Sequence, residues 1–417
     1  MNVSISNRVA WLSLGTLSLL NLLNYVDRYI VSSLVETLKK SEMHLSDAQA
    51  GLLMTAFISV YTLVFPVFGY LGDRVSRPKL LTFAVIIWSL ATMASGLAPN
   101  FYALLVCRAV VGIGEAAYVT VAPTLIADYF PAEKSGKAYA TFFAAIPIGS
   151  AIGYVLGGVL DTHFGWRSAF LFTGVPGILL SFMALRLVDP PRVLAAGDAA
   201  EKTGGSDAWK VLLLSKSTYL LASVGYAAYA FGLGGLAFWM PAYMERIRGM
   251  SHEDAAVITG GLIVVTGCIG TFLGGFCADG LRKRFGNADL VVSWISVLIC
   301  VPLLVVAFTT SSMPLFWVSL AGAELAIFMC SGPINGAIIA SLPLPMRAMG
   351  LAICNVITHI LGDVPSPSFI GWMSDRSSLV SALMIVPVAF VVCAALWLLA
   401  AAQARAELKP HEKAVVN

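Results

Sequence analysis

Long apolar stretches alternate with short polar ones along almost the whole chain. A transmembrane helix needs about 20 consecutive apolar residues, and twelve stretches approach or exceed this length. The pattern therefore predicts an all-α membrane protein with twelve transmembrane helices. The predicted spans lie at about residues 9–33, 51–71, 80–98, 102–128, 137–160, 166–188, 216–243, 254–278, 288–309, 314–341, 349–373 and 379–402.

One long polar segment interrupts this pattern. Residues 189–215 separate the first six predicted spans from the last six. We therefore expect an N-terminal six-helix bundle at 1–188, a cytoplasmic linker at 189–215, and a C-terminal six-helix bundle at 216–402. A polar cytoplasmic tail at 403–417 would follow.

The composition supports a membrane protein and excludes several other classes. Hydrophobic residues make up 58% of the chain and charged residues 12%, whereas ordinary soluble domains contain about 25% charged residues. Mean hydropathy is +0.84. The net charge of +3 comes from short loops between apolar stretches and does not indicate a nucleic-acid partner. The seven cysteines lie in apolar stretches without a C-x-x-C motif, so we expect neither metal sites nor disulfides.

Lysine and arginine residues gather on one side of the predicted membrane. Cytoplasmic loops are enriched in these residues, which predicts a multi-pass protein with both termini in the cytoplasm. We expect it in the plasma (inner) membrane. Few basic residues fall on the opposite side: Lys39, Lys40, Arg167, Arg246, Arg248 and Arg376.

A short motif recurs at every third predicted span. The pattern G-x-x-x-D stands at 69–73, 157–161, 275–279 and 371–375. The first and third copies end spans on the predicted cytoplasmic side, and the other two end spans on the opposite side. This spacing is typical of inverted three-helix repeats, two in each half of a transporter.

The first and third copies also lie in longer motifs of a known family. GYLGDRVSRPKL at 69–80 resembles the loop between helices 2 and 3 of the major facilitator superfamily, and GFCADGLRKR at 275–284 resembles its weaker second copy. AIPIGSAIGYVLGG at 145–158 is similar to the helix 5 motif of antiporter members. The resemblance implies two six-helix bundles that rock around a central site. The gate residues that it implies are Gly69, Asp73, Arg74, Arg77 and Asp279.

Three further stretches resemble one branch of that superfamily, the spinster-like transporters. They are NYVDR at 24–28, RAVVGIGEAAY at 108–118 and HILGDVPSPSFIGWMSD at 359–375. Animal members of this branch export sphingosine-1-phosphate or lysophospholipids. The resemblance implies export of an amphipathic, lipid-like substrate such as a lysophospholipid or a sphingoid phosphate. The alternatives are a drug/proton antiporter or organic-anion carrier of the same fold, and a non-transporting membrane receptor or scaffold.

Charged residues inside the first-half spans are candidates for the transport site. A charge at the bilayer centre costs at least about 2.5 kcal/mol, so such residues usually face a bundle interior and serve a function. The facilitator fold brings helices 1 and 4 together, and Asp27 is expected to pair with Arg108. Asp27 and Glu115 are candidate proton carriers, because burial and nearby charge control carboxylate protonation. Asn24, Arg28, Arg108 and Glu115 are candidate substrate ligands. A purely structural ion-pair cluster is the alternative.

The second half carries fewer buried charges. His359 and Asp363 are one helical turn apart, and histidine can exchange a proton near neutral pH, so His359 is a third candidate proton carrier. Asp363 precedes Val364 and Pro365, so it is also a candidate cap for a break in the helix. Packing in the core is the alternative for the aromatic residues. The candidate substrate ligands here are Tyr226, Tyr229, Glu324 and Asn355.

Enzyme motifs are not found. The stretch PAEKSGKA at 131–138 has Pro131 and Ala138 where a phosphate-binding loop requires glycine and a hydroxyl residue, and GIGEAA at 112–117 lies in a predicted span. We therefore expect neither an enzyme nor a cofactor-dependent protein. The expected partners are the lipid bilayer, a small amphipathic substrate and protons, with no nucleic acid, and the chain is expected to be a monomer.

Overall fold

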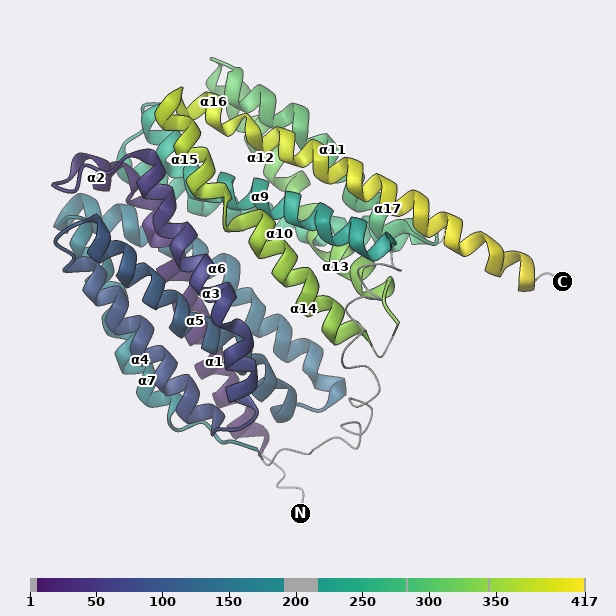
Figure 1. The fold of residues 1–417 in the computed structure, drawn as a ribbon, viewed down its shortest axis with the longest axis horizontal. Helices are drawn as coiled ribbons and strands as arrows, with labels where there is room; N and C mark the ends of the chain where they lie inside the picture. The colour runs from purple at the N-terminus through teal and green to yellow at the C-terminus, as the bar shows by residue number, and fades with distance from the viewer. Residues whose placement is uncertain (1–5, 191–216, 283, 344–345, 416–417) are drawn as a thin grey trace. The chain divides into compact units, whose positions relative to one another are not determined.

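A computed structural model describes residues 6–190, 217–282, 284–343 and 346–415. Within these residues, twelve helices or helix pairs are long and apolar enough to cross a membrane (Figure 1). The predicted number of spans and the all-α class are confirmed. The chain is therefore a multi-pass integral membrane protein.

Seven helices lie within residues 6–190, the described part of the first half. Six of them form one span each, and α2 is a short helix between the first two spans. Their bounds are α1 Asn7–Ser33, α2 Val35–Lys40, α3 Asp47–Gly72, α4 Arg77–Gly96, α5 Phe101–Tyr129, α6 Ala132–Phe164 and α7 Trp166–Ala184.

Ten helical elements lie in the described residues of the second half. Three of its spans are interrupted: α12 and α13 form one span, α14 to α15 another, and α16 and α17 the last. Their bounds are α9 Ser217–Arg246, α10 His252–Arg282, α11 Ala288–Thr309, α12 Met313–Met329, α13 Ser331–Ala340, α14 Arg347–Thr358, η3 His359–Asp363, α15 Ser366–Arg376, α16 Leu379–Leu383 and α17 Ile385–Val415.

Capping residues explain why α3 starts earlier than its apolar stretch. The Ser46 hydroxyl accepts a hydrogen bond from the Gln49 backbone N–H at 3.2 Å, and the Gln49 side chain accepts one from the Ser46 N–H at 3.0 Å. This reciprocal capping box satisfies backbone groups that a helix end leaves free. The helix therefore begins at Asp47, ahead of the predicted start at residue 51.

Close helix packing fixes α1 against α6. A Cβ atom added to Gly153 would lie 2.6 Å from the Val26 carbonyl oxygen, so only glycine allows this approach. The Asn21 side-chain amide donates a hydrogen bond to the Phe142 carbonyl at 3.0 Å. These contacts hold the part of α1 that carries Asp27 in a fixed orientation.

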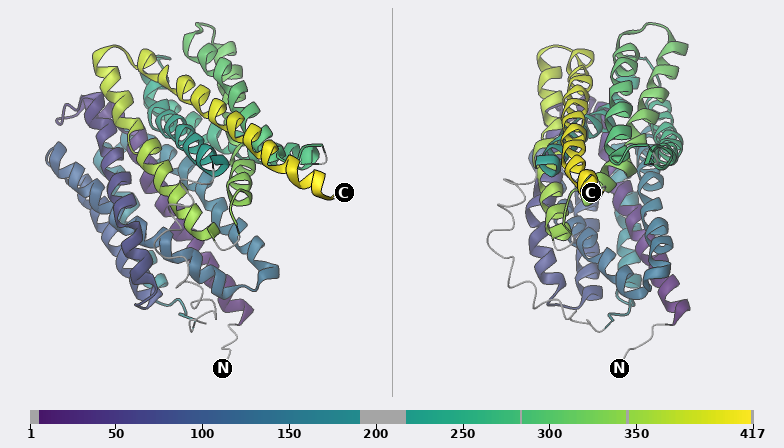
Figure 2. Two further views of the ribbon diagram at one scale, coloured as in Figure 1. Left: turned by 45° about the vertical axis from the view of Figure 1, so that its right-hand side comes forward. Right: turned by 90° about the vertical axis from the view of Figure 1, so that its right-hand side faces the viewer.

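The last helix of the chain anchors part of the second half. α11 packs against both α12 and α17 (Figure 2), and the Trp397 indole N–H donates to the Ala222 carbonyl of α9 at 3.0 Å. α17 continues as a helix to Val415, beyond the predicted end of its span at residue 402.

The chain divides into two compact units. The first comprises Met1–Val193, Ala237–Val264 and Pro367–Arg376, and the second comprises Leu194–Leu236, Val265–Ser366 and Ser377–Asn417. The first unit thus includes two segments from the second half of the sequence. Of the predicted linker at 189–215, residues 191–215 lie outside the described residues.

Candidate functional site

The first-half charges predicted as a site do come together in the first unit. Asp27 and Arg28 lie on α1, and Arg108 and Glu115 lie on α5. An Arg28 guanidinium nitrogen is 3.4 Å from a Glu115 carboxylate oxygen. The Glu115 side chain is fully buried, whereas 17% of the Arg28 side chain is exposed. Asp27 and Arg108 are also fully buried.

The expected ion pair between Asp27 and Arg108 is not formed. Among the described residues, the hydrogen bond that Asp27 accepts comes from the Thr92 hydroxyl of α4, at 3.2 Å. The Arg108 guanidinium instead lies 5.2 Å from the centre of the Phe57 ring. α1 packs mainly on α6 and α7 and touches α5 much less, which leaves Arg108 of α5 without an ion pair to Asp27.

Several polar atoms of this cluster have no hydrogen-bond partner among the described residues. They are both side-chain amide atoms of Asn24, Oδ1 of Asp27, Oε1 of Glu115 and all three guanidinium nitrogens of Arg108. A buried polar group without a partner costs about 1–3 kcal/mol. Such groups in a folded protein call for an explanation, and strain linked to function is one of the main ones.

Arg28 is the one member of this four-charge cluster with exposed atoms. The aromatic rings of Tyr25, Phe57 and Tyr61 have their centres 5.0, 5.1 and 5.4 Å from its guanidinium carbon. Cations interact favourably with the faces of aromatic rings. The cluster therefore presents one cation framed by apolar surface, which suits an anionic head group attached to an apolar body.

The candidate ligands of the second half have separate surroundings. Glu324 is buried and accepts a hydrogen bond from the Thr266 hydroxyl at 2.9 Å. Tyr229 donates its hydroxyl to the Ile327 carbonyl at 3.1 Å, and its ring centre lies 5.7 Å from that of Tyr226. Tyr229 therefore serves packing in this structure, while Asn355 is exposed.

The eleventh span contains a π-helical turn that the sequence analysis missed. The turn covers His359–Asp363, and the Val364 N–H donates to the His359 carbonyl at 3.1 Å. Within the turn, the His359 Nδ1 lies 3.0 Å from both carboxylate oxygens of Asp363. Single π turns occur frequently at functional sites. The role of His359 in proton coupling stays a prediction.

The predicted gate residues do not share one environment. Asp73 and Arg74 are exposed, and the Arg74 guanidinium stacks 3.4 Å from the centre of the Tyr70 ring. Asp279 forms an exposed ion pair with Arg282 at 2.8 Å. Gly69 does not require close packing, because an added Cβ would come no nearer than 4.0 Å to any neighbour.

Arg77 differs because it is buried in an ion-pair network. Its guanidinium contacts Asp128 at 2.5 Å and Asp189 at 3.0 Å, and Asp189 also accepts the Arg77 backbone N–H at 3.1 Å. The Tyr129 hydroxyl donates to the Val188 carbonyl at 2.6 Å. Arg77 therefore ties the start of the predicted linker to α4 and α5.

We expect Arg77→Ala to destabilise the protein. The substitution removes the buried cation that pairs with the partly buried Asp189 and the exposed Asp128, and the loss of hydrogen bonds between charged groups costs about 1.5–3 kcal/mol, less where solvent reaches them. The apparent melting temperature of the detergent-purified protein should fall by several degrees, while Arg74→Ala, at an exposed position, should leave it nearly unchanged. Equal melting temperatures for the two variants would contradict the anchoring role of Arg77.

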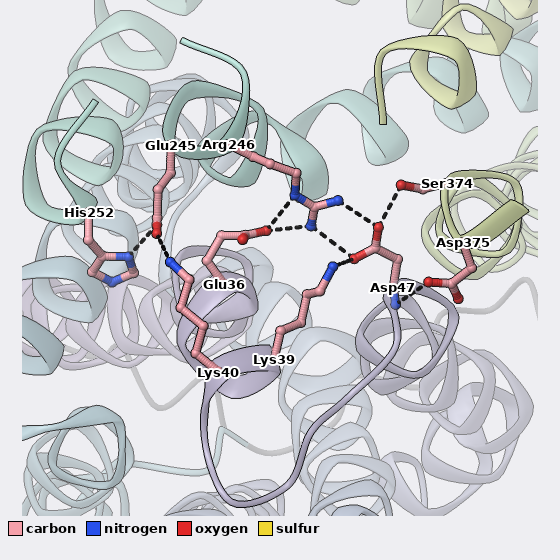
Figure 3. A network of polar contacts seen from close by, with 9 residues as sticks. All are labelled: Glu36, Lys39, Lys40, Asp47, Glu245, Arg246, His252, Ser374 and Asp375. Atoms are coloured by element: carbon pink, nitrogen blue, oxygen red, sulfur yellow. Dashed lines mark hydrogen bonds and ion pairs between the residues drawn. The ribbon is translucent and has the colours of Figure 1, made fainter. Parts of the chain in front are cut away.

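A network of ion pairs that the sequence analysis did not predict lies where α1 ends and α3 begins, here called the outer end (Figure 3). Arg246 contacts Glu36 and holds both oxygens of Asp47, at 2.7 and 2.9 Å. Lys39 also contacts Asp47, and the Ser374 hydroxyl donates to it at 2.5 Å. Paired, parallel hydrogen bonds of this kind are among the stronger charged contacts.

Two acids of the repeated G-x-x-x-D motif take part in contacts at this end. The Asp375 carboxylate accepts the backbone N–H groups of Asp47 and Ala48, both at 2.9 Å. The Asp161 carboxylate lies 3.0 Å from the His252 Nε2 at the start of α10. Each of these two copies of the motif thus meets the first turn of a helix from the other half of the sequence.

Glycines allow the same helix pairs to approach closely. An added Cβ would lie 2.2 Å from the Pro367 carbonyl oxygen at Gly51, and 2.3 Å from that of Asp47 at Gly371. At Gly260 it would lie 2.8 Å from the Ala151 carbonyl oxygen. The outer end is therefore closed by two similar helix contacts, α3 with α15 and α6 with α10. The recurrence of the motif at 157–161 and 371–375 was the sequence signal for them.

The comparisons with known proteins agree with this architecture. The family profile described as Major Facilitator Superfamily matches residues 17–364. The chain is 33% identical to protein spinster homolog 3 of Danio rerio over 399 residues, which cover 90% of this chain and 79% of the relative. It is 34% identical to the Homo sapiens protein spinster homolog 1 over 88% of this chain and 73% of the relative.

Solved structures give the same result. A bacterial homolog to the human lysosomal transporter Spinster, in an inward-facing and unoccupied conformation, matches with a TM-score of 0.86 and 25% identity, covering 95% of this chain and 98% of that one. A D-xylose-proton symporter matches with a TM-score of 0.74 at 18% identity, covering 94% and 96%. The second likeness concerns the fold alone.

Proposed function

Because the chain belongs to the spinster family of the major facilitator superfamily, which consists of transporters and not of enzymes, we propose that it couples proton movement to transport of an amphipathic, lipid-like substrate. The cycle would be one of alternating access, in which the site opens to each side of the membrane in turn. Export is the proposed direction. A lysophospholipid or a sphingoid phosphate is the proposed substrate class.

The observation that carries the proton-linked mechanism is the incompletely satisfied cluster on α1 and α5. Asp27, Arg108 and Glu115 are fully buried, yet each has polar atoms without hydrogen-bond partners among the described residues. A permanent structural ion-pair cluster would be expected to satisfy these atoms. Proton exchange at Asp27 and Glu115 would let the cluster adopt different pairings in different states, which is the behaviour that a coupled transporter needs.

The surroundings of Arg28 support an amphipathic substrate. Its side chain is partly exposed and ends in a guanidinium, a group suited to a phosphate. The adjoining rings of Tyr25, Phe57 and Tyr61 offer apolar contact. In the second half, the remaining proposed ligands are Tyr226, Tyr229, Glu324 and Asn355. The proposed cytoplasmic gate consists of Gly69, Asp73, Arg74, Arg77 and Asp279.

The proposed protein has a defined orientation in the membrane and two moving parts. The distribution of lysine and arginine supports cytoplasmic termini in a plasma (inner) membrane. Six-helix bundles at 1–188 and 216–402, joined by a linker at 189–215, are the proposed moving parts. The proposed functional form is a monomer.

Thermal stabilisation by ligands tests the substrate class. A ligand at 100 times its Kd stabilises the native state by about 2.7 kcal/mol, so a lysophospholipid or a sphingoid phosphate should raise the apparent melting temperature of the purified protein. Hydrophobic drugs and small organic anions serve as the comparison. Arg28→Gln should weaken the response to the phosphate-bearing ligands. A response to drugs or organic anions alone would contradict the lipid substrate.

A further inference from the structure

One contact of the outer-end network contains a histidine, whose imidazole can take up or release a proton. His252, the first residue of α10, lies between two carboxylates. Its Nδ1 is hydrogen-bonded to Glu245 Oε2 at 2.8 Å. Its Nε2 lies 3.0 Å from Asp161 Oδ2, within ion-pair distance but without the geometry of a hydrogen bond. Glu245 is on α9 and Asp161 is on α6. His252 thus connects three helices at the point where the outer end is closed.

Both contacts are favourable only when the imidazole is protonated. A neutral imidazole has one N–H, and its other nitrogen carries a lone pair. In the neutral form one ring nitrogen would therefore face a carboxylate oxygen with lone pairs on both atoms. Two flanking carboxylates favour the charged imidazolium, so the geometry corresponds to a protonated His252.

The other charged groups around His252 make Asp161 the carboxylate that depends on it. Lys40 of α2 contacts Glu245 at 2.7 Å, and this hydrogen bond raises the pKa of Lys40, so Glu245 keeps a cationic partner of its own. Asp161 is largely buried, and its other partner is the uncharged Thr37 hydroxyl. If His252 loses its proton, Asp161 has no cationic partner among the residues that the structure describes.

The remaining charges nearby are engaged elsewhere. Arg246, next to Glu245, is directed to Glu36 and Asp47. On α10 itself, the Asp254 carboxylate accepts the Ser251 hydroxyl at 2.6 Å, and the side chain of Glu253 is partly exposed. Both of these residues are acids, so neither can supply the positive charge that is lost when His252 is deprotonated.

The similar contact between α3 and α15 has no such dependence. There Asp375 is held by backbone N–H groups, and Asp47 is held by Arg246, whose guanidinium stays charged at all physiological pH values. Of the two contacts that close the outer end, the one between α6 and α10 is thus the one that responds to pH.

We propose that His252 controls the outer end of the transporter by its protonation, so that the protonated imidazolium holds α6 and α10 together and loss of the proton releases them. This proton site is separate from the buried cluster of Asp27 and Glu115. The chemistry involves one proton that moves between solvent and the imidazole, while the carboxylates of Asp161 and Glu245 stay ionised. It adds to the proposed function a pH control located at the gate rather than at the substrate.

A distance measurement across the contact tests this proposal. Spin labels at Thr162→Cys and Val257→Cys, in the full-length protein without substrate, report the separation of α6 and α10 from about pH 5.5 to about pH 9.5. In the parent protein we expect the short-distance population to fall as the pH rises. His252→Gln cannot carry the charge and should show a small short-distance population at every pH, whereas His252→Arg should keep a large one throughout.

The outcomes separate a charge effect from a structural one. A parent protein with no pH-dependent change, a His252→Gln variant that keeps the parent response, or a His252→Arg variant that still opens with rising pH would each overturn the proposal. Because no substrate is added, failure of the proposed lipid substrate would not affect these results.

Discussion

Replacing Asp27 with asparagine is expected to remove the pH dependence of switching between inward-open and outward-open states while leaving the fold intact. Asparagine has nearly the shape of a protonated aspartate, and it cannot ionise. Asp27 is fully buried and accepts a hydrogen bond from Thr92. A hydrogen bond to a charged group contributes about 1.5–3 kcal/mol. Fixing the neutral form therefore shifts the ratio of two conformations by about one to two powers of ten.

Labels on both faces of the protein, titrated from acid to mildly alkaline pH, measure this effect, and proton-driven transport in liposomes should be lost in parallel. Thr92→Val is the matched control, because it removes the hydroxyl and keeps the ionisable carboxylate. It should move the pH midpoint of switching without abolishing the response. If Asp27→Asn retains the normal pH response, Asp27 is a structural residue, and Glu115 or His359 becomes the leading proton carrier.

The second large effect is expected from a single methyl group at the outer end. In Gly371→Ala or Gly51→Ala the new Cβ would meet a backbone carbonyl oxygen, of Asp47 or Pro367, at 2.3 or 2.2 Å. Backbone atoms cannot move aside as a flexible side chain can, so α3 and α15 must separate. Alanine is a better helix former than glycine by about 1 kcal/mol, so the helices themselves should be preserved. We expect the outer end to stay open and transport to be nearly abolished.

The control for this prediction is Gly261→Ala, which lies on α10 near the same end with nothing within 4 Å of an added Cβ. It should transport normally. Labelling of a cysteine at Thr55, beside Ser368 in the same contact, should become fast in the two interfacial variants and stay slow in the control. Normal transport by Gly371→Ala would show that the closed contact is not needed in the cycle.

The spans could be predicted from the sequence, because a bilayer imposes an apolar length that any correct fold must meet. The charged residues of the candidate cluster could also be predicted, because charged residues inside apolar spans are rare. The pairing within the cluster could not be predicted. Asp27 accepts a hydrogen bond from Thr92, and Arg28 forms an ion pair with Glu115. These partners depend on which helices are in contact. The spacing of residues along one helix shows which side chains share a face. It does not show which face of the neighbouring helix those side chains meet.

The outer-end network was missed for a related reason. Its members are scattered through loop-like stretches, as Glu36 and Arg246 are, and in sequence they look like ordinary solvent-facing charges. The π turn at His359–Asp363 was equally hidden, because one extra residue in a helical turn leaves no distinctive pattern. A glycine in the repeated motif does not by itself show close helix packing. Gly69 has room for a side chain, whereas Gly371 has none.

The cap that Asp375 supplies to α3 gives the protein a reporter of its own. The Gln49 N–H is held by Ser46 of the same segment, whereas the N–H groups of Asp47 and Ala48 are held across the contact by Asp375. When α15 moves away, the helix stays capped, but these two amide protons become free to exchange with deuterium from solvent. Their exchange rates, compared with that of Gln49, would therefore record the fraction of time the outer end is open in unlabelled, native protein.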